Sequence, residues 1–238
     1  MTEPHEAVSD CLQGLAQTLR HHRELGFREM TLSRVPFPDP ADALGAQERA
    51  LQGCRLCKLC RSRSTVVFGS GHPRAKLMVI GEGPGEEEDR QGKPFVGRAG
   101  QLLTKMLASV GFDREHDCYI TNVVKCRPER NRNPEPDEVA ACNPFLMAQI
   151  DTLQPQVILA LGNFAAQTLL GTKEGITRLR GRTYPYRSGV LVPTFHPAFL
   201  LRNPGPEYKR MAWDDLKLAR REHDRLTAAT TPHPGPLP

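Results

Sequence analysis

Four continuous apolar runs stand out along the chain, each bounded by polar or turn-forming residues. They lie within residues 75–85, 118–126, 156–162 and 189–197, and the first of these stretches ends in glycines. Runs of this kind, without polar alternation, are typical of strands that are buried on both faces of a parallel sheet. We therefore predict four buried strands.

The segments between these runs carry apolar residues at helical spacing. They are residues 99–112, 135–153 and 163–171, and Gly111 is expected to end the first of these helices. Strands that alternate with helices indicate an α/β fold. We predict a single domain with a central, mostly parallel four-stranded sheet flanked by helices.

The two ends of the chain differ from this central part. Residues 6–25 have apolar positions at helical spacing and predict a short helix, which a proline-rich linker at residues 34–45 follows. Residues 230–238 are rich in proline and glycine and are expected to be disordered. We therefore divide the chain into an N-terminal helix and linker at 1–47, a folded domain at 48–222 and a disordered tail at 223–238.

The composition narrows the cellular setting without identifying a partner. The 238 residues include 32 Lys plus Arg against 27 Asp plus Glu, and the net charge of +5 suits a polyanionic partner and an ordinary surface equally well. The N-terminus lacks the basic and apolar regions of a secretory signal, and no apolar run approaches the roughly 18 residues of a membrane span. A cytoplasmic protein without membrane contact is expected.

Seven cysteines at uneven spacing favour metal or cluster ligation over a disulfide framework. Cys54 and Cys57 form a C-x2-C pair ahead of the first strand, and Cys126 and Cys142 form a C-x15-C pair. Four thiolates suit either Zn²⁺ or an iron–sulfur cluster, and ligand type alone does not separate the two. Because Cys60 makes a second C-x2-C pair with Cys57, the spacing leaves the choice between these pairs open.

The remaining cysteines and the basic residues near the pattern have simpler interpretations. Cys118 lies among the inward-facing residues of its predicted strand, and Cys11 lies in the predicted N-terminal helix, so both are interpreted as small apolar residues. Residues 125–136 hold several basic side chains beside Cys126. This stretch suits either a solvated loop or a rim that contacts phosphates, and the sequence favours neither.

Three loops fall at the carboxyl ends of the predicted strands, where ligands bind in such sheets: residues 81–89, the segment around Asn122, and residues 196–204. The first is rich in glycine, which lets backbone approach a ligand closely. Its acidic run repels phosphate and it lacks a Lys-Ser/Thr ending, so we exclude a nucleotide-binding loop. Phe95 is either a core aromatic residue or a stacking platform for a flat base. Asn122 either caps a turn or makes a polar contact to a ligand, and His196 is either structural or catalytic.

Together these segments resemble the uracil-DNA glycosylase superfamily, and specifically its family 4, the iron–sulfur branch. The resemblance covers about residues 50–210 and keeps the order and spacing of the motifs. The matching stretches are CRLC (54–57), GEGPGEEEDRQGKPFVGRAGQLL (81–103), YITNVVKCRPERNRNPEP (119–136), the helix around Cys142, and LVPTFHPAFLLRNP (191–204). Long ordered motifs of this kind are highly specific.

The resemblance implies a DNA-repair enzyme with a uracil-DNA glycosylase-like fold. Such a hydrolase cuts the N-glycosidic bond of deoxyuridine in DNA, releases uracil and leaves an abasic site for base excision repair. Its partner is uracil-containing DNA, and it is expected to act as a monomer in the cytoplasm, at the nucleoid. The resemblance also implies a [4Fe–4S] cluster rather than zinc, with Cys54, Cys57, Cys126 and Cys142 as its ligands.

The resemblance assigns roles to single residues as well. Phe95 stacks on the uracil ring, and Asn122 hydrogen-bonds the polar edge of the pyrimidine, where an amide distinguishes uracil from cytosine. His196 contacts the uracil carbonyl that gains negative charge as the glycosidic bond breaks. Leu200, with Leu201, is the wedge that fills the gap left by the flipped nucleotide.

One position departs from the family pattern. The first motif usually has alanine where this chain has Gly83, which is expected to line the uracil pocket together with Gly81. Neither glycine nor alanine orients water, so we expect the attacking water to be held by backbone groups or by Glu82. The catalytic set is then Glu82, Asn122 and His196. Three alternatives stay open: a uracil-DNA binding protein with little turnover, an electron-transfer iron–sulfur protein, and a zinc-stabilised DNA-binding domain.

Overall fold

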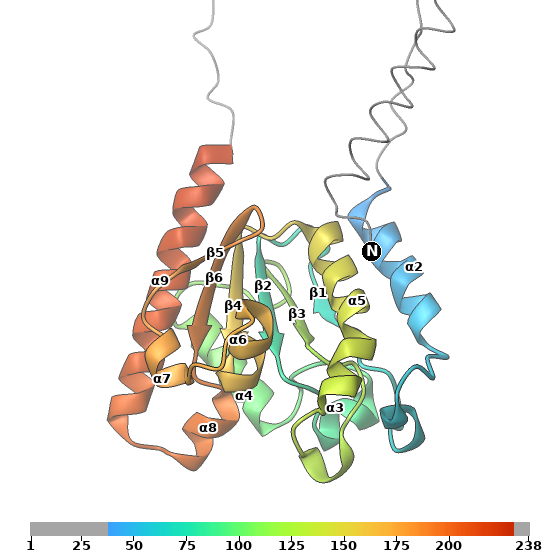
Figure 1. The fold of residues 1–238 in the computed structure, drawn as a ribbon. Coiled ribbons are helices and arrows are strands. Elements are labelled where there is room, and N and C mark those ends of the chain that lie inside the picture. The colour runs from blue at the N-terminus through green and yellow to red at the C-terminus, as the bar shows by residue number, and fades with distance from the viewer. Residues whose placement is uncertain (1–37, 231–238) are drawn as a thin grey trace, which may run out of the picture. The chain divides into compact units, whose positions relative to one another are not determined.

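The computed structural model describes residues 38–230, and a six-stranded sheet in the order β1-β3-β2-β4-β6-β5 lies at its centre (Figure 1). The strands are β1 (Ser70–Gly71), β2 (Leu77–Gly81), β3 (Cys118–Asn122), β4 (Val157–Leu161), β5 (Tyr184–Tyr186) and β6 (Gly189–Thr194). Strands β3, β2, β4 and β6 run parallel, with Leu77 of β2 opposite Cys118 of β3 and Val157 of β4. The four predicted strands and their parallel arrangement are confirmed.

The edge strands β1 and β5 are not predicted from the sequence. β1 pairs antiparallel with β3, and β5 pairs antiparallel with β6. They are only two and three residues long and are partly exposed, so they lack the buried apolar run that marks the other four. The prediction of a four-stranded sheet is therefore correct for the parallel core, whereas the whole sheet is mixed and six-stranded.

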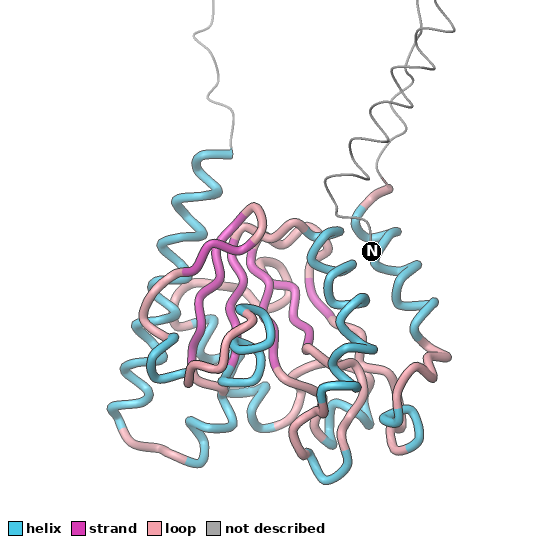
Figure 2. Tube along the Cα trace, viewed as in Figure 1, coloured by secondary structure: helices cyan, strands magenta, loops and turns pink. Residues whose placement is uncertain are grey.

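Helices lie on both sides of the strands (Figure 2). One side is covered by α2 (Pro40–Leu51), α5 (Pro136–Leu153) and α6 (Gly162–Leu170), and the other by α4 (Arg98–Ala108) and α9 (Pro206–Thr230). Because side chains alternate along a strand, Met78 and Ile80 of β2 join the first core while Leu77 and Val79 join the second. The short elements are α3 (Glu86–Gln91), α7 (Ile176–Leu179), α8 (Pro197–Arg202), η1 (Lys58–Arg61) and η2 (Glu129–Asn131).

Helix α2 begins where the sequence predicts a proline-rich linker, so that prediction is wrong for residues 40–45. Pro40 occupies the first turn, where no N–H donor is needed, and the Asp39 carboxylate accepts a backbone hydrogen bond of 2.9 Å there. The Gln47 amide donates to Thr152 Oγ1 at 2.7 Å and ties α2 to α5. The expected boundary between residues 47 and 48 therefore falls inside a helix that packs on the domain.

Helix α9 extends into the predicted tail, since it continues to Thr230. Three of its small or apolar residues are buried against the second core: Ala212, Leu216 and Ala219. The predicted N-terminal helix, Cys11 and the last eight residues lie outside the described residues. Over residues 38–230, no helix combines the length and the apolar character that crossing a membrane requires.

Candidate active site

The loops that follow β2, β3, β4 and β6 meet around one cavity of about 750 Å³. Glu82 follows β2, Asn122 ends β3, Gly162 begins α6 and His196 precedes α8, and Phe95 lies between them on the α3–α4 loop. A parallel sheet brings these segments together because the carboxyl ends of its strands share one edge. The volume is that of a small-molecule site. The predicted convergence of the three loops is observed.

The Asn122 side chain is a buried amide with an unused acceptor. It is 1% exposed, and among the described residues no donor reaches its Oδ1 atom. A Cβ on Gly81 would lie 2.5 Å from this oxygen and 2.5 Å from Phe95 Cζ, so only glycine leaves room for both side chains. An unpaired buried acceptor costs about 1–3 kcal/mol of folding free energy. The amide is therefore arranged to receive a donor from a ligand.

Phe95 adopts an unusual backbone conformation, with φ of 52°. The Glu88 carboxylate holds this turn by accepting the N–H groups of Val96 at 2.9 Å and Gly97 at 2.8 Å. Helix α4 closes on it from the other side, because a Cβ on Gly100 would lie 1.8 Å from the Phe95 carbonyl oxygen. The strained turn presents a ring whose centroid is 5.6 Å from that of His196, at 34°.

Glu88 is a site residue that the sequence analysis missed. It belongs to the run EEED, whose repulsion of phosphate is the only property assigned to it there. Glu88 is half-buried, whereas the next carboxylate, Asp89, is buried and accepts the backbone N–H groups of Ser64 at 2.9 Å and Thr65 at 3.2 Å. Two carboxylates of one short helix thus anchor two loops: Glu88 holds the α3–α4 loop that lines the cavity, and Asp89 holds the segment between η1 and β1. An acidic run in a sequence does not reveal which members face inward.

His196 caps helix α8, and this contact sets its tautomer. Its Nδ1 atom accepts the N–H of Ala198 at 3.1 Å, so the proton of the neutral ring lies on Nε2. Burial lowers the pKa of His196 to about 4, and the charge of Arg202 acts in the same direction. Gly162 has φ of 87°, and a Cβ there would lie 2.9 Å from His196 Cβ. The result is a neutral imidazole that offers one N–H donor to the cavity.

Glu82 and Gly83 form the part of the cavity that follows β2. Burial raises the pKa of Glu82 above its usual range. The Val124 N–H donates to the Glu82 carbonyl at 3.1 Å, which places the Val124 side chain beside Gly83. A Cβ on Gly83 would lie 2.9 Å from Val124 Cγ2, well inside normal carbon contact. Glycine here matches the packing of Val124, and alanine would require that side chain to move.

The structure separates the two leucines that the sequence analysis groups as a wedge. Leu200 is 3% exposed and belongs to the core beneath α4 and α9, so it is a core residue here. Leu201 is 40% exposed. Successive residues of a helix point about 100° apart, which is why adjacent leucines of α8 meet such different surroundings.

Lys125, predicted to lie in a solvated loop or a phosphate-contacting rim, is instead fully buried. Its ammonium donates to Thr121 Oγ1 at 2.6 Å, to the Asn122 carbonyl at 2.7 Å and to Gln149 Oε1 at 2.6 Å. Burial lowers the pKa of Lys125 to about 7. The side chain supports the end of β3 beneath Asn122 and has no access to a DNA phosphate.

Four thiols from distant parts of the chain, those of Cys54, Cys57, Cys126 and Cys142, lie at the same hydrophobic core. Cys126 and Cys142 are buried, and Cys54 and Cys57 pack against the same core. Arg63 Nη1 donates to Cys126 Sγ at 3.1 Å, while Arg63 Nη2 donates to the Cys54 carbonyl at 2.7 Å. A backbone N–H donates to Cys142 Sγ at 3.3 Å. Donors directed at sulfur suit thiolates rather than apolar thiols.

Burial raises the pKa of three of these thiols, Cys57, Cys126 and Cys142, and so opposes their ionisation. It raises the pKa of Cys126 to about 11 despite the hydrogen bond from Arg63, and the nearby Cys142 and Cys57 add to the rise. Four thiolates in this position therefore need a cationic centre to balance them. Within residues 38–230, no three His, Cys, Asp or Glu side chains are set closely enough to hold a single metal ion. The all-sulfur donor set fits an iron–sulfur cluster.

Comparison with known proteins matches residues 68–217 to the Uracil DNA glycosylase superfamily. The chain is 48% identical over 169 residues to a type-4 uracil-DNA glycosylase of Thermotoga maritima, covering 70% of this chain and 88% of that protein. It is 40% identical over 188 residues to a type-4 uracil-DNA glycosylase of Sulfurisphaera tokodaii, covering 75% of this chain and 84% of that protein. A type-5 uracil-DNA glycosylase of Pyrobaculum aerophilum is 30% identical over 157 residues, or 57% of this chain and 66% of that protein.

Proposed function

Because the chain belongs to the uracil-DNA glycosylase superfamily, we propose that it hydrolyses the N-glycosidic bond of deoxyuridine in DNA. The reaction releases uracil and leaves an abasic site, the first step of base excision repair. The observation that carries this proposal is the buried Asn122 amide with its unused Oδ1, set beside an aromatic ring and a neutral histidine in one cavity. We assign the glycosylase domain to residues 38–230.

The base is recognised by shape and by its hydrogen-bonding edge. Uracil must leave the DNA stack to enter the cavity, at a cost of a few kcal/mol that a mispaired uracil lowers. There the Phe95 ring stacks on it, and the Asn122 amide accepts from its N3–H and donates to its O4. Cytosine offers the opposite donor pattern on this edge, so it leaves the buried amide mispaired and is rejected.

The bond breaks by separation of charge. Positive charge develops on the sugar and negative charge on the uracil O2 atom, to which the Nε2–H of His196 donates. One such preorganised donor contributes about 3–4 kcal/mol to transition-state stabilisation. Glu82 lines the same cavity and holds the attacking water, with help from backbone groups of the loop at Gly83. Leu201, the exposed leucine of α8, is the wedge that enters the duplex.

We propose that Cys54, Cys57, Cys126 and Cys142 bind a [4Fe–4S] cluster. When bound, it would supply a cationic iron centre that balances four thiolates, two of them buried and two partly buried. It would join the segment before β1 to the loop after β3 and to α5, and so would hold the chain on both sides of residues 127–135. We assign the protein's action to the nucleoid, in the cytoplasm, where its DNA substrate lies. We expect it to act as a monomer, because one chain provides every residue of the proposed site.

Single-turnover cleavage of an oligonucleotide with one uracil tests this function, with thymine and hypoxanthine oligonucleotides as controls and anaerobically purified protein. Free uracil and an abasic product, with none from thymine, are expected. Tight binding without release would instead favour a uracil-DNA binding protein with little turnover. The departure of Gly83 from the family pattern is the reason for considering that alternative. Absence of both binding and release would reject the proposal.

A further inference from the structure

The two sides of the cavity carry opposite charge. The β2–α3 loop and α3 bring four carboxylates to one side: Glu82, Glu86, Glu87 and Glu88. They outnumber the two other cations that line the cavity, Arg98 and Arg132, and Arg132 is already paired with Glu138. Among the described residues, the side formed by residues 161–202 has no carboxylate, and Arg202 is its one permanent cation. A phosphodiester backbone is repelled from the first side and attracted to the second. A DNA strand that enters this cavity is therefore directed along α6 and α8.

Arg202 is free to bind an anion. It ends α8 and is exposed, and within residues 38–230 its guanidinium has no hydrogen-bond or ion-pair partner. The positive charge of Arg202 helps burial to lower the pKa of His196, which indicates that the two side chains lie near each other. A planar guanidinium with unused donors suits the two oxygens of a phosphodiester.

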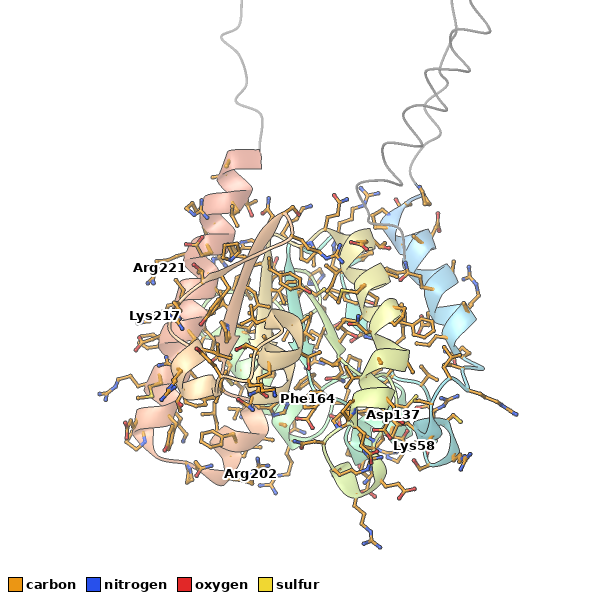
Figure 3. All side chains as sticks on the ribbon, in the orientation of Figure 1. Lys58, Asp137, Phe164, Arg202, Lys217 and Arg221 are labelled. Atoms are coloured by element: carbon orange, nitrogen blue, oxygen red, sulfur yellow. The ribbon has the colours of Figure 1, made fainter. Side chains whose placement is uncertain are left out.

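Phe164 provides a further aromatic surface in the same cavity, apart from Phe195 and Phe199, which stack on each other. It lies in the first turn of α6, packs against the first core and lines the cavity with its remaining surface. Figure 3 shows Phe164 on α6 and Arg202 on α8, both at the end of the sheet where the cavity opens. Phe95 already serves the flipped base, so Phe164 is available to another one. Aromatic side chains stack on any base, because every base has a π face.

We propose that Phe164 and Arg202 form a subsite for the nucleotide that adjoins the target deoxyuridine in the same strand. Arg202 binds the phosphodiester between the two nucleotides, and Phe164 stacks on the neighbouring base. This subsite rests on the proposed glycosylase function and extends it from one nucleotide to two. It requires that the base on one side of uracil leaves its stack together with the target, so flexible single-stranded DNA is the favoured substrate form.

The test compares substrates within each variant, so that a general loss of stability does not affect the result. Single-stranded oligonucleotides carry one uracil and either a normal neighbour, an abasic neighbour on the 5′ or 3′ side, or an uncharged methylphosphonate linkage next to it. The wild-type protein is expected to lose about five-fold to a hundred-fold in kcat/KM when the base on one of the two sides is removed. Phe164→Ala is expected to cleave the normal and the abasic-neighbour substrates equally, while Phe164→Tyr keeps the wild-type difference.

The phosphate contact is tested in the same way. Arg202→Gln is expected to lose the discrimination against the methylphosphonate, whereas Arg221→Gln, on α9 away from the cavity, keeps it (Figure 3). If the wild-type protein releases uracil but Phe164→Ala shows the same neighbour effect as wild type, the subsite is overturned and the glycosylase function stands. If the wild-type protein releases no uracil from any substrate, both fall.

Discussion

The backbone N–H of Ala198 donates to Nδ1 of His196 at 3.1 Å, and this one contact decides what the imidazole can do. With Nδ1 occupied as an acceptor, the neutral ring carries its proton on Nε2 and becomes a donor. The same contact caps helix α8, so the orientation of the ring is fixed by the fold before any ligand arrives. A preorganised neutral donor stabilises a departing uracil anion without the cost of burying an imidazolium.

Replacing His196 by leucine removes this donor and keeps much of the side-chain volume. We expect His196→Leu to fold, to lose about 1 kcal/mol of unfolding free energy with the helix cap, and to lose roughly a hundred-fold to a thousand-fold in single-turnover rate. His72→Leu is a matched control, because His72 Nδ1 accepts the Arg74 N–H at 3.2 Å in the same manner outside the cavity. A His196→Leu protein with normal turnover would remove the central role of this residue.

The pH dependence follows from the direction of the His196 pKa. Burial lowers it from 6.5 to about 4, so between these values an unfolded chain takes up a proton that the folded protein refuses. The free energy of unfolding is therefore expected to fall as the pH drops from about 6.5 to 4, and less steeply in His196→Leu. NMR of the His196 ring should show the neutral form down to about pH 5. A ring that titrates near pH 6.5 would contradict the neutral-donor mechanism.

Gly83→Ala tests the packing of the first motif against Val124. The added methyl group meets Val124 Cγ2 at 2.9 Å, so we expect a loss of about 1–3 kcal/mol in unfolding free energy. Adding Val124→Ala makes room, and the double variant should be more stable than the sum of the two single changes implies. Gly53→Ala, where a Cβ meets nothing within 4 Å, is the control. Strict additivity in chemical denaturation would argue against the contact.

Glu88→Ala releases the turn that presents Phe95. Because the carboxylate accepts two backbone N–H groups, we expect KM for uracil DNA to rise about ten-fold or more, since two charge-assisted hydrogen bonds are worth over 1.4 kcal/mol together. Glu87→Ala is the comparison, because Glu87 makes an exposed ion pair with Arg90, of little energetic value. Equal behaviour of the two variants in steady-state kinetics would show that Glu88 does not position the ring.

The cluster ligands are tested by iron content and by absorbance of anaerobic protein. Cys54→Ser and Cys126→Ser are expected to lose most of the iron and the brown colour, while Cys60→Ser keeps about four irons per chain. Cys60 lies beside Cys57, to whose carbonyl its N–H donates at 3.3 Å, so it is the matched neighbouring thiol. If Cys60→Ser loses iron and Cys54→Ser keeps it, Cys60 is the ligand in place of Cys54. Zinc in place of iron would reject the cluster.

Local patterns in the sequence determine the parallel core of the fold and the residues that face the cavity. The four apolar runs become β2, β3, β4 and β6 because a strand buried on both faces must be apolar throughout, which a single sequence displays directly. The position of Asn122 and His196 at strand ends follows, since parallel strands share a carboxyl edge. The family resemblance then predicts roles for these side chains, and the match over residues 68–217 confirms the family.

Only the tertiary structure decides which side chains meet across the sequence. From the sequence, Lys125 and Glu88 are expected to be surface charges. In the fold, the Lys125 ammonium donates to three buried acceptors, and the Glu88 carboxylate accepts two backbone N–H groups. Leu200 and Leu201 are the same residue type in adjacent positions, and their exposure differs only because α8 turns one of them into the core. Helix α2 likewise depends on α5, against which it packs. Such pairings depend on distances between segments remote in the chain, which hydrophobic periodicity does not encode.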